Sequence, residues 1–196
     1  MGLVDHPLVR PFNCTDAPGV RRLLHDLPLL YQDGARWLHR RLGEMCEGGA
    51  SGTVATYGGI IVGVIIETPK TSHRSKLSTI YVRPGFRRCG VGRAMLTASL
   101  AELARRGTTD VHLTVATSVE HSLLPLLSGL RFDRVAVERN RYGKGRHEAI
   151  YLASALHPRV TQALGRSGCS FADDPVGDLG AIQNLVSARC AWASLR

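Results

Sequence analysis

Residues 83–92, with the sequence RPGFRRCGVG, combine three arginines with three glycines and one cysteine. A strand-like run precedes them, and Met95, Leu96 and Leu100 follow at helical spacing. A glycine-rich turn that enters a helix leaves backbone N–H groups unpaired at the positive end of the helix dipole. Because glycine also lets the backbone approach a ligand closely, the segment predicts a phosphate-binding cradle.

Two other phosphate-binding motifs fit this segment less well. A dinucleotide fingerprint requires a third glycine, whereas Gly90 and Gly92 are followed by Arg93, Ala94 and Met95. A nucleotide P-loop requires Gly-Lys-Ser/Thr, and that triplet does not occur in the chain. The remaining alternative is a strand-to-helix turn that binds nothing, which the arginines and the flanking elements argue against.

The segment resembles the acyl-CoA-binding motif of the GCN5-related N-acetyltransferases (GNAT), written Arg/Gln-x-x-Gly-x-Gly/Ala, over a region from roughly residue 8 to residue 155. The resemblance implies that the diphosphate of an acyl-CoA, most commonly acetyl-CoA, lies on the amides of residues 88–93, and that pantetheine follows the fourth strand. The implied cofactor-binding residues are Ile80, Tyr81, Val82, Arg87, Arg88, Cys89, Gly90, Val91, Gly92 and Arg93.

The chain departs from the family motif at two positions. Position 88 is usually glycine and position 89 is usually basic, whereas this chain has Arg88 and Cys89. Arg88 must therefore adopt a backbone conformation that glycine often serves. Cys89 is either a reactive thiol activated by the helix N-terminus or a small filler residue.

Acyl transfer to an amine requires a neutral nitrogen, a base and support for the developing oxyanion. Many family members use a tyrosine on the helix before the sixth strand to protonate the departing thiolate, and here Leu127 stands at that position. The glutamate that many members carry on the fourth strand is also absent. Neither common catalytic residue is therefore in its usual place.

Three residues are the candidate substitutes. Tyr142, in a basic loop at 139–147, is a candidate proton donor, and Glu67 and Glu148 are candidate bases. His73 and His112 are further possible bases. For each of them the alternative is an ordinary exposed, salt-bridged or packed side chain.

The elements that must position these residues follow the order β-α-α-β-β-β-α-β-α-β-β, as in the acetyltransferase family. This order predicts an α/β (α+β) GNAT acyl-CoA N-acyltransferase fold, in which about four helices flank a central mixed, mostly antiparallel sheet of about seven strands. We expect the domain to span residues 1–156 and a C-terminal extension, with a linker and a possible amphipathic helix, to span 157–196. The predicted strands are 8–12, 53–57, 60–66, 76–82, 110–116, 131–139 and 148–153, and the predicted helices begin near 15, 35, 92 and 122.

Composition limits the partners and the compartment. The net charge of +9, from 25 basic and 16 acidic residues, suits a polyanionic ligand such as coenzyme A, a nucleic acid or an acidic protein surface. The five cysteines are odd in number and scattered, which argues against a disulfide framework and a zinc site. Without a long apolar run or a signal peptide, the chain is expected to be cytoplasmic, with no membrane partner and no metal.

The sequence therefore predicts an enzyme, an N-acetyltransferase that transfers an acetyl group from acetyl-CoA to an amine by direct attack in a ternary complex. The acceptor is open: a small molecule, a protein or an aminoacyl-tRNA. The alternatives are a protein of this fold that binds or modifies nucleic acid, and a catalytically inactive CoA-binding regulator. A homodimer is one candidate assembly.

Overall fold

The computed structural model describes residues 6–26, 33–141 and 144–154. Its centre is a seven-stranded sheet in the order β1-β2-β3-β4-β5-β7-β6, in which only β4 and β5 run parallel to each other. The predicted fold class and element order are confirmed. The strands are β1 (Leu8–Pro11), β2 (Ser51–Tyr57), β3 (Ile60–Pro69), β4 (Arg74–Val82), β5 (Asp110–Ala116), β6 (Asp133–Glu138) and β7 (Glu148–Ser154).

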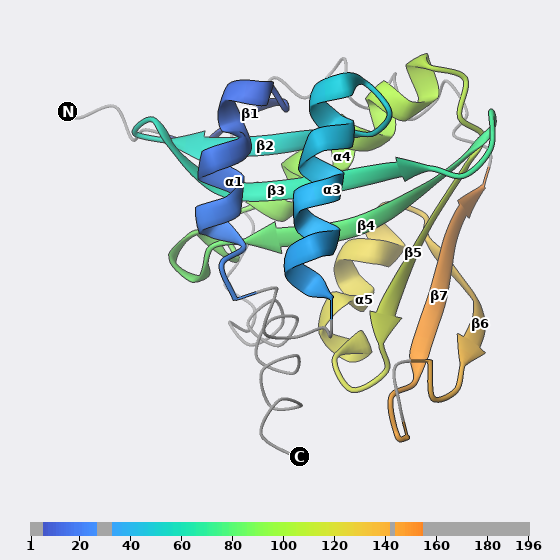
Figure 1. Ribbon diagram of the computed structural model, residues 1–196. Coiled ribbons are helices and arrows are strands. Elements are labelled where there is room, and N and C mark those ends of the chain that lie inside the picture. Colours follow the sequence, from blue (N-terminus) through green and yellow to red (C-terminus); the bar gives the residue numbers. More distant parts are fainter. Residues whose placement is uncertain (1–5, 27–32, 142–143, 155–196) are drawn as a thin grey trace.

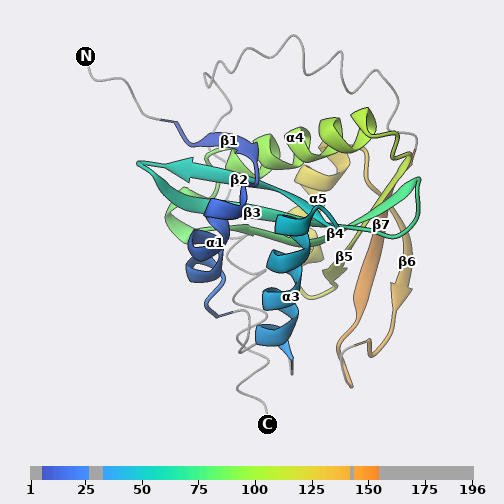
Figure 2. The ribbon, with the colours of Figure 1, turned by 45° about the horizontal axis from the view of Figure 1, so that its top comes forward.

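Helices cover both faces of the sheet (Figures 1 and 2). One face carries α1 (Ala17–Leu23) and α3 (Gly34–Glu47), and the opposite face carries α4 (Val91–Arg105) and α5 (Glu120–Gly129). Short 3-10 helices, η1 (Cys14–Asp16) and η2 (Pro84–Phe86), precede α1 and α4. We refer to the two sides as the α1–α3 face and the α4–α5 face. No described helix has the length and apolar character that a membrane span requires.

Each face of the sheet has its own hydrophobic core. Met95, Leu100 and Leu123 of α4 and α5 pack with Val111, Leu113 and other strand residues, whereas Leu38 and Leu42 of α3 pack with Val64 and Ile66. Successive side chains of a strand point to opposite faces of the sheet. The strand residues that belong to one core therefore show on which face their neighbours in the strand lie.

Strands β4 and β5 separate soon after they begin. Their pairing is limited to three positions, Arg74 with Asp110, Ser75 with Val111, and Lys76 with His112. Beyond this point the strands diverge. A register shift in the β3–β4 pairing, where Ile66 faces Thr79 and Glu67 faces Leu77, leaves Ser78 as an extra residue in β4. Such a bulge bends its strand and increases the local twist.

Local sequence explains several element boundaries. Gly48 ends α3 in the left-handed conformation at φ 82°, and Gly58 and Gly59 turn the β2–β3 hairpin at φ 53° and 77°. The helix expected near residue 122 begins at Glu120, and Pro125 lies in its interior. The expected C-terminal extension lies outside the described residues.

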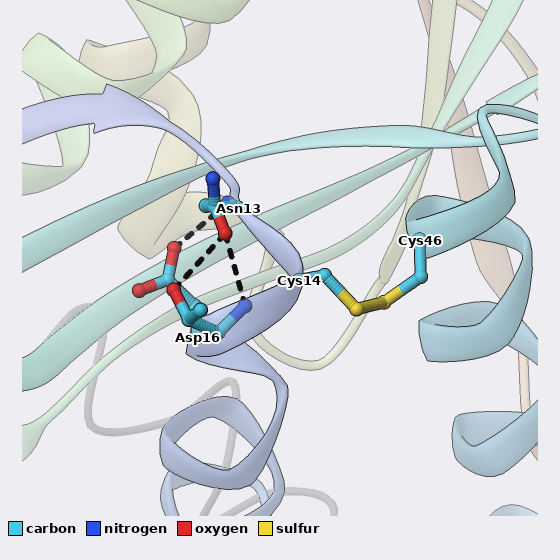
Figure 3. Close-up of a disulfide and its surroundings, with 5 residues drawn as sticks. Asn13, Cys14, Asp16 and Cys46 are labelled. Atoms are coloured by element: carbon cyan, nitrogen blue, oxygen red, sulfur yellow. Dashed lines mark hydrogen bonds between the residues drawn. A yellow bond between two sulfur atoms is a disulfide. The ribbon is translucent and has the colours of Figure 1, made fainter.

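Cys14 and Cys46 form a disulfide between η1 and the last turn of α3 (Figure 3). Their Cα atoms are 5.0 Å apart, although 32 positions separate them in the sequence. The inference from cysteine count and spacing is therefore wrong for this pair, because the packing of α3 beside α1 brings the two side chains together. Cys89 is a free, exposed thiol. Cys169 and Cys190 lie outside the described residues.

Candidate functional site

The predicted cradle forms the junction between β4 and α4. Gly90 is the N-cap of α4 at φ 75°, and no side chain of the described residues caps the helix. The first turn of α4 therefore presents backbone N–H groups that are available to an anion. Arg88 has φ 65°, which confirms that a residue with a Cβ occupies the glycine-like conformation expected there.

The side chain of Arg87 is used inside the fold. It is 8% exposed, its Nε donates to the Val82 carbonyl at 2.8 Å, and its guanidinium lies over the ring of Tyr81 at 5.7 Å. Burial lowers the pKa of Arg87, and the neighbouring Tyr81 partly offsets this effect. The side chain of Arg87, the first residue of the motif, thus packs against the end of β4. The backbone of Arg87 remains a predicted contact of the cofactor.

Arg93 extends from the first turn of α4 to the end of α5. A Cβ placed on Gly129 would lie 3.3 Å from Arg93 Nη1, so the absence of a side chain at Gly129 makes room for the guanidinium. The C-terminal end of a helix attracts cations. Arg93 thus lies near the C-terminal end of α5 as well as in the first turn of α4.

A cleft opens where β4 and β5 separate. The empty space in it is about 470 Å³, which includes open solvent. Its polar lining includes Ser78, Thr79 and Thr114, and its walls are mainly leucines. The lining residues are Leu77, Ser78, Thr79, Ile80, Leu96, Leu113, Thr114, Val115, Leu123, Leu126 and Leu127.

The cleft and the cradle together fit an acyl-CoA. The diphosphate would meet the amides of the α4 first turn, and the pantetheine arm would meet the backbone edges that β4 and β5 leave unpaired beyond Lys76 and His112. Ile80 lines the cleft, whereas Tyr81 packs against the core of the α1–α3 face. Leu127 also lines the cleft, so the position of the absent tyrosine does border the reaction space.

On the α1–α3 face, polar side chains gather beside the closed end of the cleft. His112 and Thr114 alternate with the core residues of β5 and therefore lie on this face, and Lys76 is the register partner of His112. Burial lowers the pKa of Lys76, assisted by the cations Arg141 and Lys70 and opposed by Glu148 and Glu138. Sequence reasoning missed Lys76 because an alternating strand pattern does not reveal where two strands separate.

Glu67 lies on the other side of the sheet. It is 2% exposed, accepts from Arg106 Nη2 at 2.7 Å and from Ser51 Oγ at 2.6 Å, and the arginine also donates to Ser51. Arg106 follows the last residue of α4. This geometry favours a structural ion pair between α4 and the sheet rather than the role of catalytic base.

Of the other two candidate catalytic residues, the structure describes Glu148 but not Tyr142. Glu148 is 6% exposed and lies opposite Ala116, on the α1–α3 face near the open end of the strands. Tyr142 lies outside the described residues. His73, one of the two possible histidine bases, is exposed before β4 begins.

Tyr151 of β7 is a buried tyrosine near α5, but its hydroxyl is engaged. It donates to Glu120 at 2.6 Å, and Glu120 also pairs with Arg134. Burial and then the Glu120 carboxylate raise the pKa of Tyr151 to about 12. A phenol with so high a pKa is a poor proton donor, so Tyr151 does not replace the absent tyrosine.

Comparison with known proteins agrees with this geometry. Residues 20–126, just over half of the chain, match the model of the acetyltransferase (GNAT) family. The ribosomal protein bS18-alanine N-acetyltransferase of Escherichia coli (strain K12) is 35% identical over 79 residues, which are 39% of this chain and 53% of that protein. The chain thus spans about half the length of the curated relatives it matches.

Solved structures share the fold. A putative acetyltransferase of the GNAT family from Desulfovibrio desulfuricans superimposes with a TM-score of 0.66 at 20% identity, covering 76% of this chain and 99% of that one. A GNAT family acetyltransferase from Elizabethkingia anophelis with acetyl-CoA bound gives a TM-score of 0.60 at 14% identity, covering 76% and 99% of the two chains.

Proposed function

Because the chain belongs to the acetyltransferase (GNAT) family, we propose that it transfers an acetyl group from acetyl-CoA to the α-amino group of a polypeptide. The observation that carries the donor half of this proposal is the separation of β4 from β5 directly beside the uncapped start of α4. The separated strands supply unpaired backbone groups, and the start of α4 supplies unpaired N–H groups. Together they suit a ligand that joins an amide-containing arm to a diphosphate.

Acetyl-CoA supplies a thioester whose carbonyl carbon is open to attack by an amine and whose sulfur is the leaving group. The residues of this chain bind and orient that group and handle the protons. The leucines of α4, β5 and α5 give the cleft apolar walls. Direct attack in a ternary complex needs no nucleophilic side chain, which agrees with a cleft lined by hydroxyls and aliphatic groups.

The acceptor half of the proposal is supported by the curated relative, which is named for acetylating an alanine of a ribosomal protein. The α1–α3 face leaves the polar side chains at the closed end of the cleft beside the bulge of β4. We place the activity in the cytoplasm, where acetyl-CoA and newly made polypeptides occur together.

The donor assignment is tested by thermal unfolding with acetyl-CoA. A ligand at 100 times its dissociation constant stabilises the folded state by about 2.7 kcal/mol, which raises the Tm by roughly 5–10 °C in a domain of this size. Cys89→Glu, which places a carboxylate at the cradle, should remove most of this shift. His39→Glu adds the same charge on an exposed position of α3 and should keep it.

The acceptor assignment is tested by acetyl-CoA consumption over a panel of synthetic peptides with free N-termini, aminoglycosides and aminoacyl-tRNA. Acetylation of peptides, located at the α-amine by mass spectrometry, is the expected result. Stabilisation by acetyl-CoA without transfer to any acceptor would favour the inactive regulator instead. Preferential modification of the tRNA species would move the acceptor to nucleic acid.

A further inference from the structure

His112 lies on the α1–α3 face, at the last paired position before β4 and β5 separate. It is the last β5 residue paired with β4, and Thr114, two residues further along the same face, lines the cleft. Two strand residues span roughly 7 Å, so an amine at the floor of the cleft lies within reach of the imidazole, directly or through one water. The opposite neighbour of His112 on β7 is the apolar Leu152.

The imidazole is half-buried and incompletely satisfied. Its Nδ1 is inaccessible to solvent and makes no hydrogen bond with the described residues. Buried polar atoms in native proteins almost always have a partner, and exceptions often mark functional sites. Because Nδ1 is closed to solvent, the acceptor would meet the remaining, accessible part of the half-buried ring.

The groups around His112 hold the ring neutral. Burial is the largest cause of its lowered pKa, followed by the positive charges of Lys76, Lys70 and Arg74, and the Ser75 backbone acts weakly in the opposite direction. Arg74 is itself paired with Asp110, and Glu148 and Glu138 act on Lys76 from the β6–β7 side. A lowered pKa favours the neutral imidazole at neutral pH, and a neutral imidazole carries one nitrogen that can accept a proton.

We propose that His112 is the catalytic base that accepts the proton of the acceptor amine. This assignment rests on the proposed acetyl transfer and adds to it the residue that the sequence left open. It takes the place of the strand glutamate that many family members use and that this chain lacks. Lys76, beside it in the register, is a positioning residue that keeps the imidazole uncharged.

The proton balance is complete without a further reactant. The C–N bond forms as the amine attacks the thioester carbonyl, and the amine proton passes to His112. The C–S bond breaks as the carbonyl re-forms, and sulfur leaves with the bonding electron pair. The imidazolium then returns a proton to the thiolate, directly or through water, so that the products are the N-acetyl amide and free CoA.

Other described residues near the site serve this role less well. Glu148 lies opposite Ala116, four residues from His112 and toward the open end of the strands. Glu67 is buried in its ion pair on the opposite face. Ser78 and Thr68 hydroxyls bond each other at 2.8 Å, and a hydroxyl is too weak a base at neutral pH.

The first test measures the ionisation of His112 in the full-length protein without ligand. Histidine ring resonances in NMR spectra, assigned by comparison with His112→Gln, should titrate with a pKa below 6.5 for this residue. Lys76→Met should shift the His112 titration to higher pH, because a repelling charge is removed. If the pKa of His112 is at or above 6.5 and Lys76→Met does not change it, the electrostatic part of the proposal is overturned.

The second test follows acetylation of a synthetic peptide with N-terminal alanine. General bases contribute typically 10²–10⁴-fold to the rate, so His112→Gln should lower kcat/KM by about that factor. The rise of kcat/KM with pH near the pKa of His112 should disappear in this variant. Acetyl-CoA should still stabilise it against unfolding. His112→Ala should recover part of the rate with added imidazole. His121→Gln, exposed on α5, is the control and should change none of these readouts.

The outcomes separate the two proposals. If the wild type acetylates the peptide and His112→Gln does so at the same rate with the same pH profile, the base assignment fails and the function stands. If the wild type transfers acetyl to no member of the acceptor panel, the proposed function fails and the base role fails with it. Loss of activity in His112→Ala that imidazole does not relieve would indicate a structural role.

Discussion

At the scale of single residues, Arg88 holds a conformation that residues with a Cβ rarely adopt, at φ 65°. A left-handed backbone costs such a residue about 1 kcal/mol or more. We therefore expect Arg88→Gly to leave the free energy of unfolding unchanged or to raise it by up to about 1 kcal/mol, as glycine relieves the strain.

Gly90→Ala is the matched opposite change, because it introduces a Cβ at φ 75°. It should destabilise the protein by about 1 kcal/mol and weaken acetyl-CoA binding at the start of α4. Urea unfolding and calorimetric titration with acetyl-CoA measure both effects. Equal losses of stability in Arg88→Gly and Gly90→Ala would show that left-handed backbone strain does not determine the stability of this turn.

Glu67 offers a test between a catalytic and a structural carboxylate. Glu67→Gln should lower the free energy of unfolding by about 1–3 kcal/mol, because Arg106 and Ser51 lose a charged partner. The rate per folded molecule should stay within about twofold, since a residue outside the reaction leaves transition-state stabilisation unchanged. Glu47→Gln, exposed at the end of α3, is the control for stability. A large fall in kcat with unchanged stability would restore Glu67 as a base.

His112 also makes the stability of the fold depend on pH. Its pKa is lowered in the folded state, so below about 6.5 the unfolded chain takes up this proton more readily than the folded protein does. The contribution of His112 to stability is therefore full above pH 6.5 and declines as the pH falls toward the folded-state pKa. The denaturation midpoint of His112→Gln should fall less between pH 7 and pH 5 than that of the wild type. Parallel curves for the two proteins would contradict this linkage.

At the scale of elements, the disulfide fastens α3 to the turn before α1. A crosslink that closes about 30 residues removes roughly 3–4 kcal/mol of unfolded-state entropy in the chain-entropy model. Cys46→Ser should lower the stability of the oxidised protein by an amount of this order, and reduction of the wild type should do the same. Cys89→Ser should not change it. The chain has five cysteines, so the intact pair leaves three thiols. More than three thiols in protein that is unfolded without a reducing agent would show that the pair is reduced under those conditions.

The pairing of β4 with β3 contributes to the separation of β4 from β5. The bulge at Ser78 interrupts the regular β3–β4 pairing two residues after the last β4–β5 pair, at Lys76 and His112. A bulge increases twist, which turns the rest of β4 away from its parallel neighbour. The bulge therefore helps to create the cleft and also places its polar residues at the reaction space.

At the scale of the whole molecule, the division into a domain and an extension stays a prediction. A chain ending at residue 156 retains every described element, and we expect it to keep the acetyl-CoA-dependent rise in Tm seen with the full chain. Size-exclusion chromatography with light scattering of both chains tests whether residues 157–196 contribute to a homodimer. Loss of folding in the shortened chain would assign the extension to the domain itself.

The amino-acid sequence by itself determined the element order, the hairpin at Gly58-Gly59 and the cradle at Gly90. Each of these depends on local periodicity or on a backbone conformation that few residues adopt. It also identified the unusual Arg88, because the motif has a fixed spacing.

Only the tertiary structure decided which side chains meet. It buried Arg87 against Tyr81 and paired Cys14 with Cys46. It also placed Glu67 beside Arg106 and His112 at the point where β4 and β5 separate. These outcomes depend on strand register, on a one-residue bulge and on helix packing across 30 or more positions. A one-residue change of register moves a side chain to the other face of the sheet, and spacing along the chain carries no record of it.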